Sequence, residues 1–467
     1  MNAFLNHMLS TLHRTCALLV CLLALQNVLL AEEFPDEEIP ERVDAAASDA
    51  VTTDGMDVDL APGEEIDASG QPMDSAPGKP AANVAAHDEE ELPVRGENFV
   101  ETGPAHAPAV PLAEAVIVAE GNAEPLHILG VDVAPGTTER LTWAATELFE
   151  GVPVSTPVLV INGTTPGPTL CLTAAVHGDE LNGIEMVRRV MHDVTAEHLS
   201  GAIIGVPIVN VQGFRRGSRY LPDRRDLNRY FPGNPNGSAA ARIANSFFEN
   251  VVVHCDALVD IHTGSFERAN LPQIRADLRD PDVVTLTQGF GATVILHSTP
   301  GAGTLRYAAT QAGIPTVTLE AGGPLVLELN EVIHGVKGIE TLISSLGMVK
   351  KIRLWGSPQP VYYRSSWVRA GAGGILLANV SLGSTVREGD ILGVITDPMS
   401  NANKEIRSPY SGRIIGMARN QVVMPGFAAF HIGIQADYAA VENDGDSLVL
   451  GPGEVINEGA DLDGISE

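Results

Sequence analysis

The chain has 467 residues, of which 44% are hydrophobic, so we expect at least two folded units rather than one core. Its net charge of -30 excludes nucleic-acid binding as a main function, because phosphate binding requires clustered Lys and Arg. Most of this charge lies in two segments. Residues 32–102 hold 21 acids and three bases, and residues 442–467 hold eight acids and no base.

Residues 1–31 are predicted to be a signal peptide. Arg14 precedes an apolar run at residues 16–25, and the small Ala31 stands just before the first acids. The run is short for a membrane span, so we expect membrane contact only through this segment, if it is not cleaved. The protein is therefore expected to be periplasmic or secreted.

Residues 32–111 are predicted to form a disordered acidic spacer. They are rich in Ala, Pro, Gly, Asp and Glu and contain few aromatic residues. Such a segment buries too little apolar surface to offset the entropy lost on ordering. The segment 442–467 is predicted to be an acidic tail.

Residues 112–348 are predicted to form an α/β catalytic domain that begins with short β segments. Apolar strand-like runs such as "TLCLTAAV", "GAIIGVPIVN" and "IPTVTLE" alternate with helical ones such as "GIEMVRRVMHDV" and "AARIANSFFENVV". This alternation favours a largely parallel sheet covered by helices. Functional groups in such sheets lie at the carboxyl ends of the strands.

Residues 349–441 are predicted to be a second, all-β domain. The spacing in "GSTVREGDILGVI" resembles the barrel-sandwich folds of biotinyl and lipoyl carrier domains. Those domains attach the cofactor to a lysine at a hairpin tip. Here Pro398 stands at the expected place and Lys404 is displaced, so a β domain without an attached cofactor is the better interpretation.

Three polar motifs follow predicted strands: "HGDE" with His177 and Glu180, "DIHTG" with His262, and "TLEAGG" with Glu320. Two histidines and one glutamate form a ligand set that suits catalytic zinc, which lowers the pKa of bound water. Glu320 is then the candidate general base and later acid. Taken singly, each motif also fits a polar turn, a core histidine or a solvent-facing carboxylate.

Two acidic residues beside these motifs remain ambiguous. Asp260 either accepts a hydrogen bond from a ligand histidine or is a solvated strand end. Asp179, between the first two candidate ligands, is expected to cap a turn rather than to bind metal.

The segment "SRYLPDRRDLNRYFPG" carries the candidate substrate-binding residues. Arg229 can bind a carboxylate with two hydrogen bonds, and Asn228 can donate beside it. Arg219 can reach either the substrate carboxylate or the developing oxyanion. The alternative is an arginine-rich surface loop in which Asp223 and Asp226 pair with the local arginines.

Together, HxxE, "DLNRYFPG", "DIHTG" and "TLEAGG", in this order, resemble the succinylglutamate desuccinylase and aspartoacylase family, relatives of zinc carboxypeptidases. The resemblance implies a carboxypeptidase-like mixed sheet flanked by helices, followed by a small barrel-sandwich-like β domain. It also implies one zinc ion per chain. The implied residues are zinc ligands His177, Glu180 and His262, base Glu320, substrate-binding Asn228 and Arg229, and Arg219 near the carbonyl.

The resulting hypothesis is a zinc hydrolase that removes an acyl group from a small carboxylate-bearing amine, such as an N-acyl amino acid. Two alternatives remain: a metallocarboxypeptidase or amidase acting on peptides or cell-wall fragments, and a non-catalytic binding or scaffold protein. No tyrosine is assigned as a substrate clamp, although Tyr307, Tyr362 and Tyr363 are available. Homo-oligomerisation and ester substrates stay open.

Two of the four cysteines, Cys171 and Cys255, lie outside the predicted signal peptide. Both fall in or beside predicted core strands. We expect two buried thiols, although an oxidising compartment would permit a disulfide.

Overall fold

The computed structural model describes residues 123–149, 152–350 and 359–436. The predicted signal peptide, acidic spacer and acidic tail lie outside these residues. No helix in the described ranges combines the length and the apolar character needed to cross a membrane.

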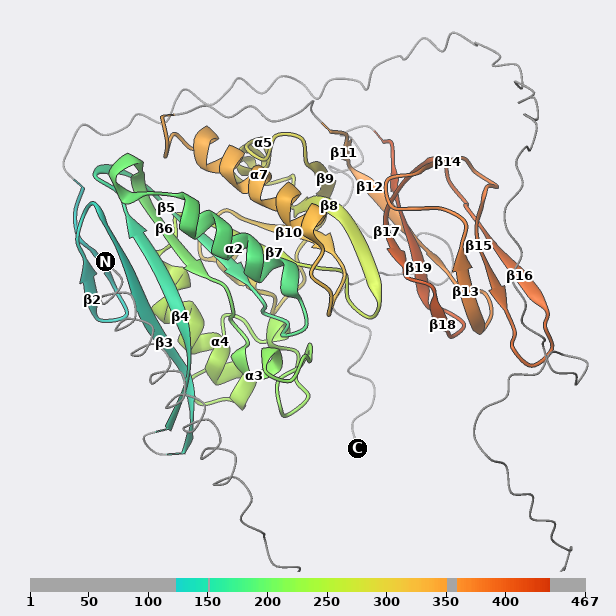
Figure 1. The fold of residues 1–467 in the computed structure, drawn as a ribbon, viewed down its shortest axis with the longest axis horizontal. Helices are drawn as coiled ribbons and strands as arrows, with labels where there is room; N and C mark the ends of the chain where they lie inside the picture. The colour runs from blue at the N-terminus through green and yellow to red at the C-terminus, as the bar shows by residue number, and fades with distance from the viewer. Residues whose placement is uncertain (1–122, 150–151, 351–358, 437–467) are drawn as a thin grey trace, which may run out of the picture. The chain divides into compact units, whose positions relative to one another are not determined.

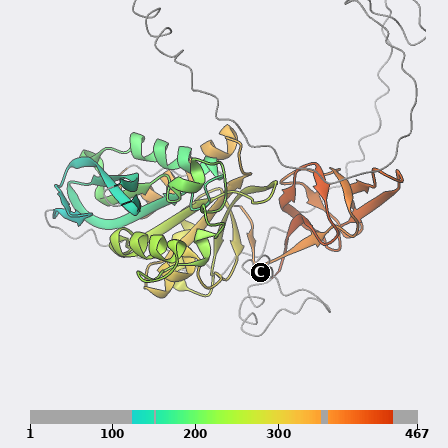
Figure 2. The same cartoon turned by 90° about the horizontal axis from the view of Figure 1, so that it is seen from below.

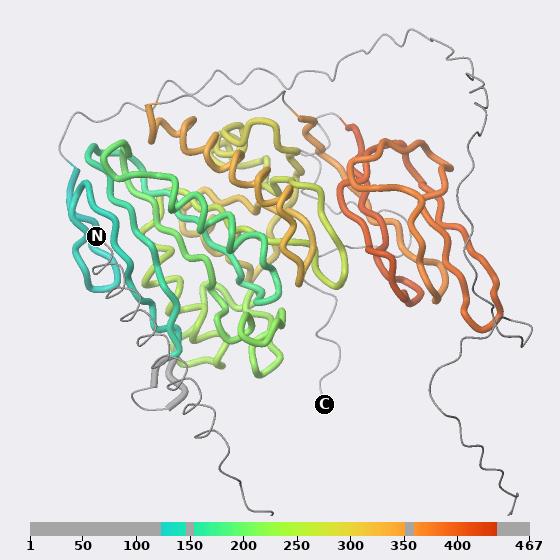
Figure 3. The backbone as a smooth tube through the Cα atoms, in the orientation of Figure 1, coloured from blue at the N-terminus to red at the C-terminus, as the bar shows by residue number. Residues whose placement is uncertain are grey.

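The described chain begins with antiparallel β structure, as the alternating residues and the Pro135-Gly136 turn predict. Gly136 adopts a positive φ of 74°, which glycine tolerates without strain. Figure 3 traces the long hairpin that follows. The strands are β1 (Leu126–Ile128), β2 (Val131–Val133), β3 (Thr137–Phe149) and β4 (Val152–Asn162).

A mixed sheet forms the centre of the catalytic domain, in the order β8-β10-β7-β5-β6-β4-β3 (Figure 1). Its inner strands β10, β7, β5 and β6 are parallel, and β8, β4 and β3 add antiparallel pairs. These strands are β5 (Thr165–Ala174), β6 (Ser200–Val206), β7 (Ala257–His262), β8 (Arg268–Ala276), β9 (Val294–His297), which pairs with β8, and β10 (Thr316–Gly322).

Helices cover both faces of this sheet (Figures 1 and 2). Side chains alternate along each strand, so Leu172 packs under α2 and α7 while Cys171 packs under α4. The helices are α2 (Leu181–Asp193), α3 (Val211–Phe214), α4 (Ala239–Asn250), α5 (Pro281–Gln288), α6 (Leu305–Gln311) and α7 (Leu329–Ser345), with short 3-10 turns η1 (Ala196–His198), η2 (Leu227–Arg229) and η3 (Val252–His254). The mixed sheet with flanking helices confirms the predicted fold class.

The two cysteines form a disulfide, which corrects the expectation of free thiols. Cys171 lies in β5 and Cys255 follows η3, with their Cα atoms 5.7 Å apart. The bond closes a loop of 84 residues inside the core. The sequence alone could not show that Cys171 in β5 and Cys255 after η3 lie next to each other in the fold.

The C-terminal region forms antiparallel strands around its own core, as predicted, apart from the short β11, which pairs parallel with β9. Lys404 lies within β16 and donates to the Gly371 carbonyl at 2.8 Å, so it is not at a hairpin tip. The strands are β11 (Val361–Tyr362), β12 (Arg364–Arg369), β13 (Gly374–Ala378), β14 (Thr385–Val386), β15 (Ile391–Thr396), β16 (Asn403–Arg407), β17 (Gly412–Ala418), β18 (Gln421–Val423) and β19 (Ala428–Ile434). Strand β17 pairs antiparallel with β8, so the central sheet continues into this region.

Candidate active site

The sheet brings the three polar motifs together at the ends of adjacent strands. His177 follows β5, Glu180 is the N-cap residue of α2, and His262 ends β7. Glu320 pairs in register with His262 across the parallel strands β10 and β7. The turn between His177 and Glu180 requires glycine at position 178, because a Cβ there would lie 2.1 Å from the backbone of Gly213.

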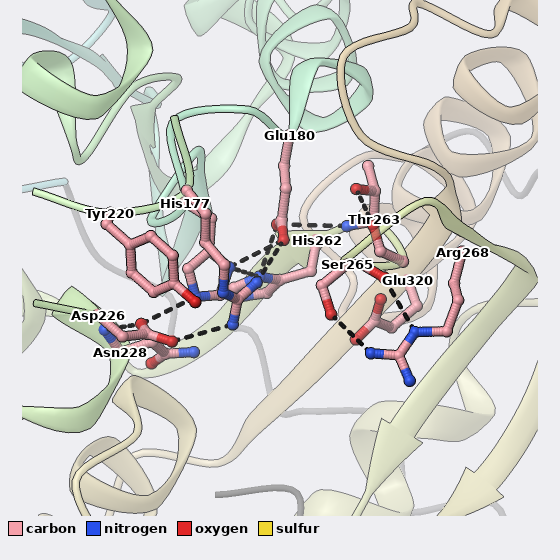
Figure 4. A network of polar contacts seen from close by, with 12 residues as sticks. His177, Glu180, Tyr220, Asp226, Asn228, His262, Thr263, Ser265, Arg268 and Glu320 are labelled. Carbon is pink, nitrogen blue, oxygen red and sulfur yellow. Dashed lines mark hydrogen bonds and ion pairs between the residues drawn. The ribbon is translucent and has the colours of Figure 1, made fainter. Parts of the chain in front are cut away.

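His177, Glu180 and His262 converge on one point (Figure 4). Glu180 bridges the histidines: its Oε1 lies 2.8 Å from Nδ1 of His177, and its Oε2 lies 2.8 Å from Nδ1 of His262. The two Nδ1 atoms are 3.2 Å apart, and all three side chains are buried. Each residue therefore turns one ligand atom toward a shared centre.

The far side of each imidazole contacts an aspartate. Nε2 of His262 lies 2.7 Å from Asp260, whose other oxygen accepts from Thr173 at 2.8 Å. Nε2 of His177 lies 3.1 Å from Asp226. A carboxylate at Nε2 holds the proton there and leaves the Nδ1 lone pair directed at the centre. Asp260, ambiguous in the sequence, is thus a buried hydrogen-bond acceptor.

These donors fit a zinc ion. Tetrahedral ligands about 2.0 Å from the metal lie about 3.3 Å apart, close to the observed separations of 2.8 to 3.2 Å. A set of two imidazoles and one carboxylate is the chemistry that such zinc sites use.

Charge within the site favours ionised Glu180 and protonated histidines when no metal is bound. Burial and the nearby Arg219 lower the pKa of His177, but the carboxylates of Glu180 and Asp226 outweigh them and raise it. Burial also opposes protonation of His262, yet Asp260 and Glu180 raise its pKa well above the ordinary value. Metal binding would displace these protons.

Glu320 is buried, with 8% of its surface exposed, which rules out the solvent-facing alternative. Its Oε2 accepts a hydrogen bond from Nδ2 of Asn270 at 2.9 Å, and its Oε1 lies 3.5 Å from Arg275. Both partners come from the neighbouring strand β8. They hold the carboxylate within the cavity that contains the histidines.

Asn228, one of the candidate substrate-binding residues, lies on the side of the histidines opposite Glu320 (Figure 4). Asn228 accepts the Leu305 N–H through its Oδ1 at 2.8 Å, so its amide nitrogen is the group that can bind a carboxylate. Arg229 lines the same cavity. Arg219 lies 3.0 Å from Asp226 and 3.4 Å from Glu180. Its charge is therefore already paired with these two carboxylates before any substrate binds.

Asp226 is the functional residue that sequence reasoning missed. In the sequence it reads only as a partner for local arginines. In the structure it contacts His177, caps η2 by accepting the Asn228 N–H at 2.9 Å, and binds Arg219. Burial raises its pKa, but His177 and the arginines lower it far below the ordinary value. Its place at the head of "DLNR" was the available signal.

The cavity around these residues has a volume of about 820 Å³ and is strongly basic. The aromatic residues Trp367 and Phe427 of the C-terminal strands line part of it. Tyr220 and Tyr230 line it as well, whereas Tyr307, Tyr362 and Tyr363 are not among its lining residues. Its arginines are Arg219, Arg224, Arg225, Arg229, Arg268, Arg275, Arg306 and Arg369.

Comparison with known proteins gives consistent matches. Residues 166–346 match the model of the succinylglutamate desuccinylase/aspartoacylase catalytic domain. The chain is 28% identical to the N-alpha-acetyl-L-2,4-diaminobutyric acid deacetylase of Halomonas elongata, over 56% of this chain and 78% of that protein. It is 31% identical to the succinylglutamate desuccinylase of Pseudomonas aeruginosa, over 40% of this chain but only 58% of that protein.

A solved structure resembles most of the described fold. It is the product-bound ectoine utilization protein EutE (DoeB) from Ruegeria pomeroyi, with a TM-score of 0.59 and 25% sequence identity. The match covers 67% of this chain and 99% of that protein. The likeness therefore extends beyond the catalytic domain into the C-terminal strands.

Proposed function

Because the chain belongs to the succinylglutamate desuccinylase/aspartoacylase family, we propose that it is a zinc-dependent hydrolase of N-acyl amino acid-like substrates. One observation carries the proposal. A buried set of two histidines and one glutamate shares a basic cavity with a buried carboxylate, Glu320, and with the Asn228–Arg229 pair. This arrangement provides metal ligands, a base and an anion-binding group around one space.

His177, Glu180 and His262 would hold the zinc ion. When bound, zinc would polarise the acyl carbonyl and make hydroxide available near neutral pH. The chain's own contribution is to fix the ligand atoms. Asp226 and Asp260 orient the two imidazoles from outside, so the centre is preorganised before substrate arrives.

Glu320 is the proposed proton carrier. Its carboxylate would accept a proton from the attacking water as the new carbon–oxygen bond forms. The same carboxyl group would then protonate the amine nitrogen as the carbon–nitrogen bond breaks. Asn270 and Arg275 support this role, because their contacts with the two carboxylate oxygens hold the group in place within the cavity.

Asn228 and Arg229 would bind the carboxylate of the substrate. An arginine can bind both carboxylate oxygens, and the Asn228 amide lies beside it. The overall excess of arginine in the cavity supports an anionic substrate. Arg219, close to Glu180 and Asp226, would stabilise negative charge that develops near the centre.

A peptide-directed carboxypeptidase or amidase remains the second candidate. The cavity volume of about 820 Å³ is near the upper end of small-molecule sites, which span about 300–1,000 Å³. A cavity of this size accommodates substrates longer than an acetylated amino acid. The same ligands and the same carboxylate-binding pair would serve either reaction.

We also propose that the protein is exported. Disulfides persist in oxidising compartments, so the bond between Cys171 and Cys255 supports a periplasmic or secreted location. Cell fractionation with thiol labelling tests this proposal. Recovery of the protein in the cytoplasmic fraction with both thiols reduced would contradict it.

The function is tested with a panel of N-acetyl and N-succinyl amino acids and short peptides, assayed for released amine. We expect about one zinc per chain in wild type and in Glu320→Gln, little zinc in His177→Ala, and no activity in either of these two variants. Glu197→Gln, an exposed carboxylate in η1, serves as the matched control and should be fully active. Activity retained in Glu320→Gln would refute the assigned base.

A further inference from the structure

The C-terminal region contacts strand β8, the segment after Glu320 and the loop after His262. We propose that this region positions the general base, with Gly416, Asn270 and Arg419 as positioning residues. The inference rests on the proposed role of Glu320. It gives the C-terminal region a function in catalysis rather than in cofactor attachment.

The first contact runs from Gly416 through Asn270 to Glu320. Gly416 of β17 pairs with Asn270 of β8. A Cβ on Gly416 would lie 2.7 Å from Oδ1 of Asn270, so the two residues are already in close contact. The other end of the same amide donates to Glu320 at 2.9 Å. The backbone of β17 therefore limits where the Asn270 amide, and hence the base, can lie.

The second contact passes through Arg419, which follows β17. Its guanidinium lies 2.9 Å from Oε1 of Glu328. The other oxygen of Glu328 accepts the Gly323 N–H at 2.7 Å, three residues after Glu320. The Glu328 N–H also donates to Asn182 at 2.8 Å, and Asn182 donates to the Ala321 carbonyl at 3.0 Å, directly after the base. Arg419 thus stabilises the segment that follows Glu320 through its ion pair with Glu328.

The third contact holds the loop after His262. The Glu267 carbonyl accepts from the Arg419 N–H at 2.9 Å and from the Gln421 side chain at 3.0 Å. Phe266 and Glu267 both have positive φ values, 55° and 59°, so the loop needs such support to keep its conformation. The turn that contains Arg419 therefore contacts both the segment after Glu320 and the loop after His262.

The aromatic residues of the C-terminal strands add to this third contact. The Arg268 guanidinium lies 5.1 Å from the Trp367 ring and 5.6 Å from the Phe427 ring. In Figure 4, Arg268 lies on the same side of the histidines as Glu320. The Gly264 N–H donates to the Gly322 carbonyl at 2.9 Å, which links the two loops directly. Movement at either loop would displace the base relative to the metal ligands.

Loss of these contacts should affect the rate of catalysis more than the binding of substrate. The substrate carboxylate would be bound by Asn228 and Arg229, which these three contacts do not involve. A base displaced by about 1 Å can lower the rate about 100-fold. Perturbing the C-terminal contacts should therefore lower kcat and leave KM and metal content close to wild type.

The test is a double-mutant cycle of Gly416→Ala and Asn270→Ala on the full-length, zinc-loaded enzyme. Each single variant should lower kcat about 10- to 100-fold. Gly416→Ala should add little in the Asn270→Ala background, because its methyl group then enters the space that the amide left. Gly371→Ala is the control: its Cβ would meet only the flexible end of Lys404, and it should match wild type.

A second pair of variants covers the case in which Gly416→Ala fails to fold. Arg419→Gln should lower kcat at unchanged zinc content, and Arg419→Lys should restore part of it by keeping the ion pair. Arg413→Gln, also from β17 but bonded to the Gly383 carbonyl, is the matched control and should be fully active.

Three outcomes would overturn the inference: equal losses for Gly416→Ala in both backgrounds, wild-type kcat in Gly416→Ala and Arg419→Gln, or a change in KM alone. A wild-type enzyme that binds zinc but turns over no member of the substrate panel would instead refute the proposed function. The two failures are therefore distinguishable.

Discussion

Replacing Asp226 by Ala should weaken metal binding although Asp226 is not itself a candidate ligand. The change removes the acceptor 3.1 Å from Nε2 of His177, so the ring loses the group that directs its Nδ1 at the metal. It also removes the carboxylate 3.0 Å from Arg219, whose side chain is only 13% exposed, which leaves a positive charge less compensated near the cation. The loss of ring orientation and the less compensated charge should both weaken metal binding.

Loss of an orienting partner behind a ligand typically lowers metal affinity about 10- to 100-fold. This corresponds to about 1.4–2.8 kcal/mol, since each tenfold change is about 1.4 kcal/mol. Because Arg219 would then keep only its contact with Glu180 at 3.4 Å, its less compensated charge would repel the cation, and we expect the upper half of this range for Asp226→Ala. Asp226→Asn keeps an acceptor oxygen and should lose about tenfold or less.

Zinc affinity is measured by competition with a chelating indicator at fixed pH. Asp223→Ala is the matched control, because this aspartate of the same loop pairs with the exposed Arg225 and does not contact the site. Wild-type zinc affinity in a cooperatively folded Asp226→Ala would refute the reasoning. An equal loss in Asp223→Ala would point to disruption of the loop instead.

Three further predictions concern stability and substrate binding. Cys171→Ala/Cys255→Ala should lower the free energy of unfolding by about 2–5 kcal/mol in denaturant titrations, and an unchanged value would contradict a formed disulfide that closes an 84-residue loop. Burial and the nearby Lys337 lower the pKa of His334 to about 4, so its stabilising contribution is present above pH 6.5 and is lost as the pH falls toward 4. His334→Gln should flatten the stability profile across that window, and profiles of identical slope would refute the assignment. Arg229→Lys should raise KM for carboxylate substrates at least tenfold with little change in kcat, measured by steady-state kinetics, because lysine cannot bind a carboxylate with two parallel bonds; an unchanged KM would remove Arg229 from the substrate site.

The local features of the site were readable from the sequence. His177 and Glu180 lie three residues apart in one turn, so their convergence needs no distant contact. His262 and Glu320 each end an apolar run, and parallel strands place such ends along one edge. The strand and helix periodicities of residues 112–348 predict the fold class, because they too depend only on residues close in the sequence.

Other features depended on which distant residues meet. Cys171 and Cys255 look like two core thiols until β5 and the segment after η3 are packed together. Asp226 reads as a loop aspartate until the loop folds over His177, 49 residues earlier. Nothing in the local pattern distinguishes Asn270 from other strand residues, yet it contacts the base from 50 residues away.

The candidate ligand types, the candidate base and the order of strands and helices can be predicted from the amino-acid sequence alone, because they follow from short-range periodicity and from residue chemistry. The hydrogen-bond partners of those groups become known once the chain is folded. Such partners are set by strand register and packing between distant segments, as where Gly416 of β17 meets Asn270 of β8. The same holds where β8 pairs with β10 and Asn270 lies opposite Gly322. A one-residue shift of β8 against β10 would turn the side chain of Asn270 to the opposite face of the sheet and away from Glu320.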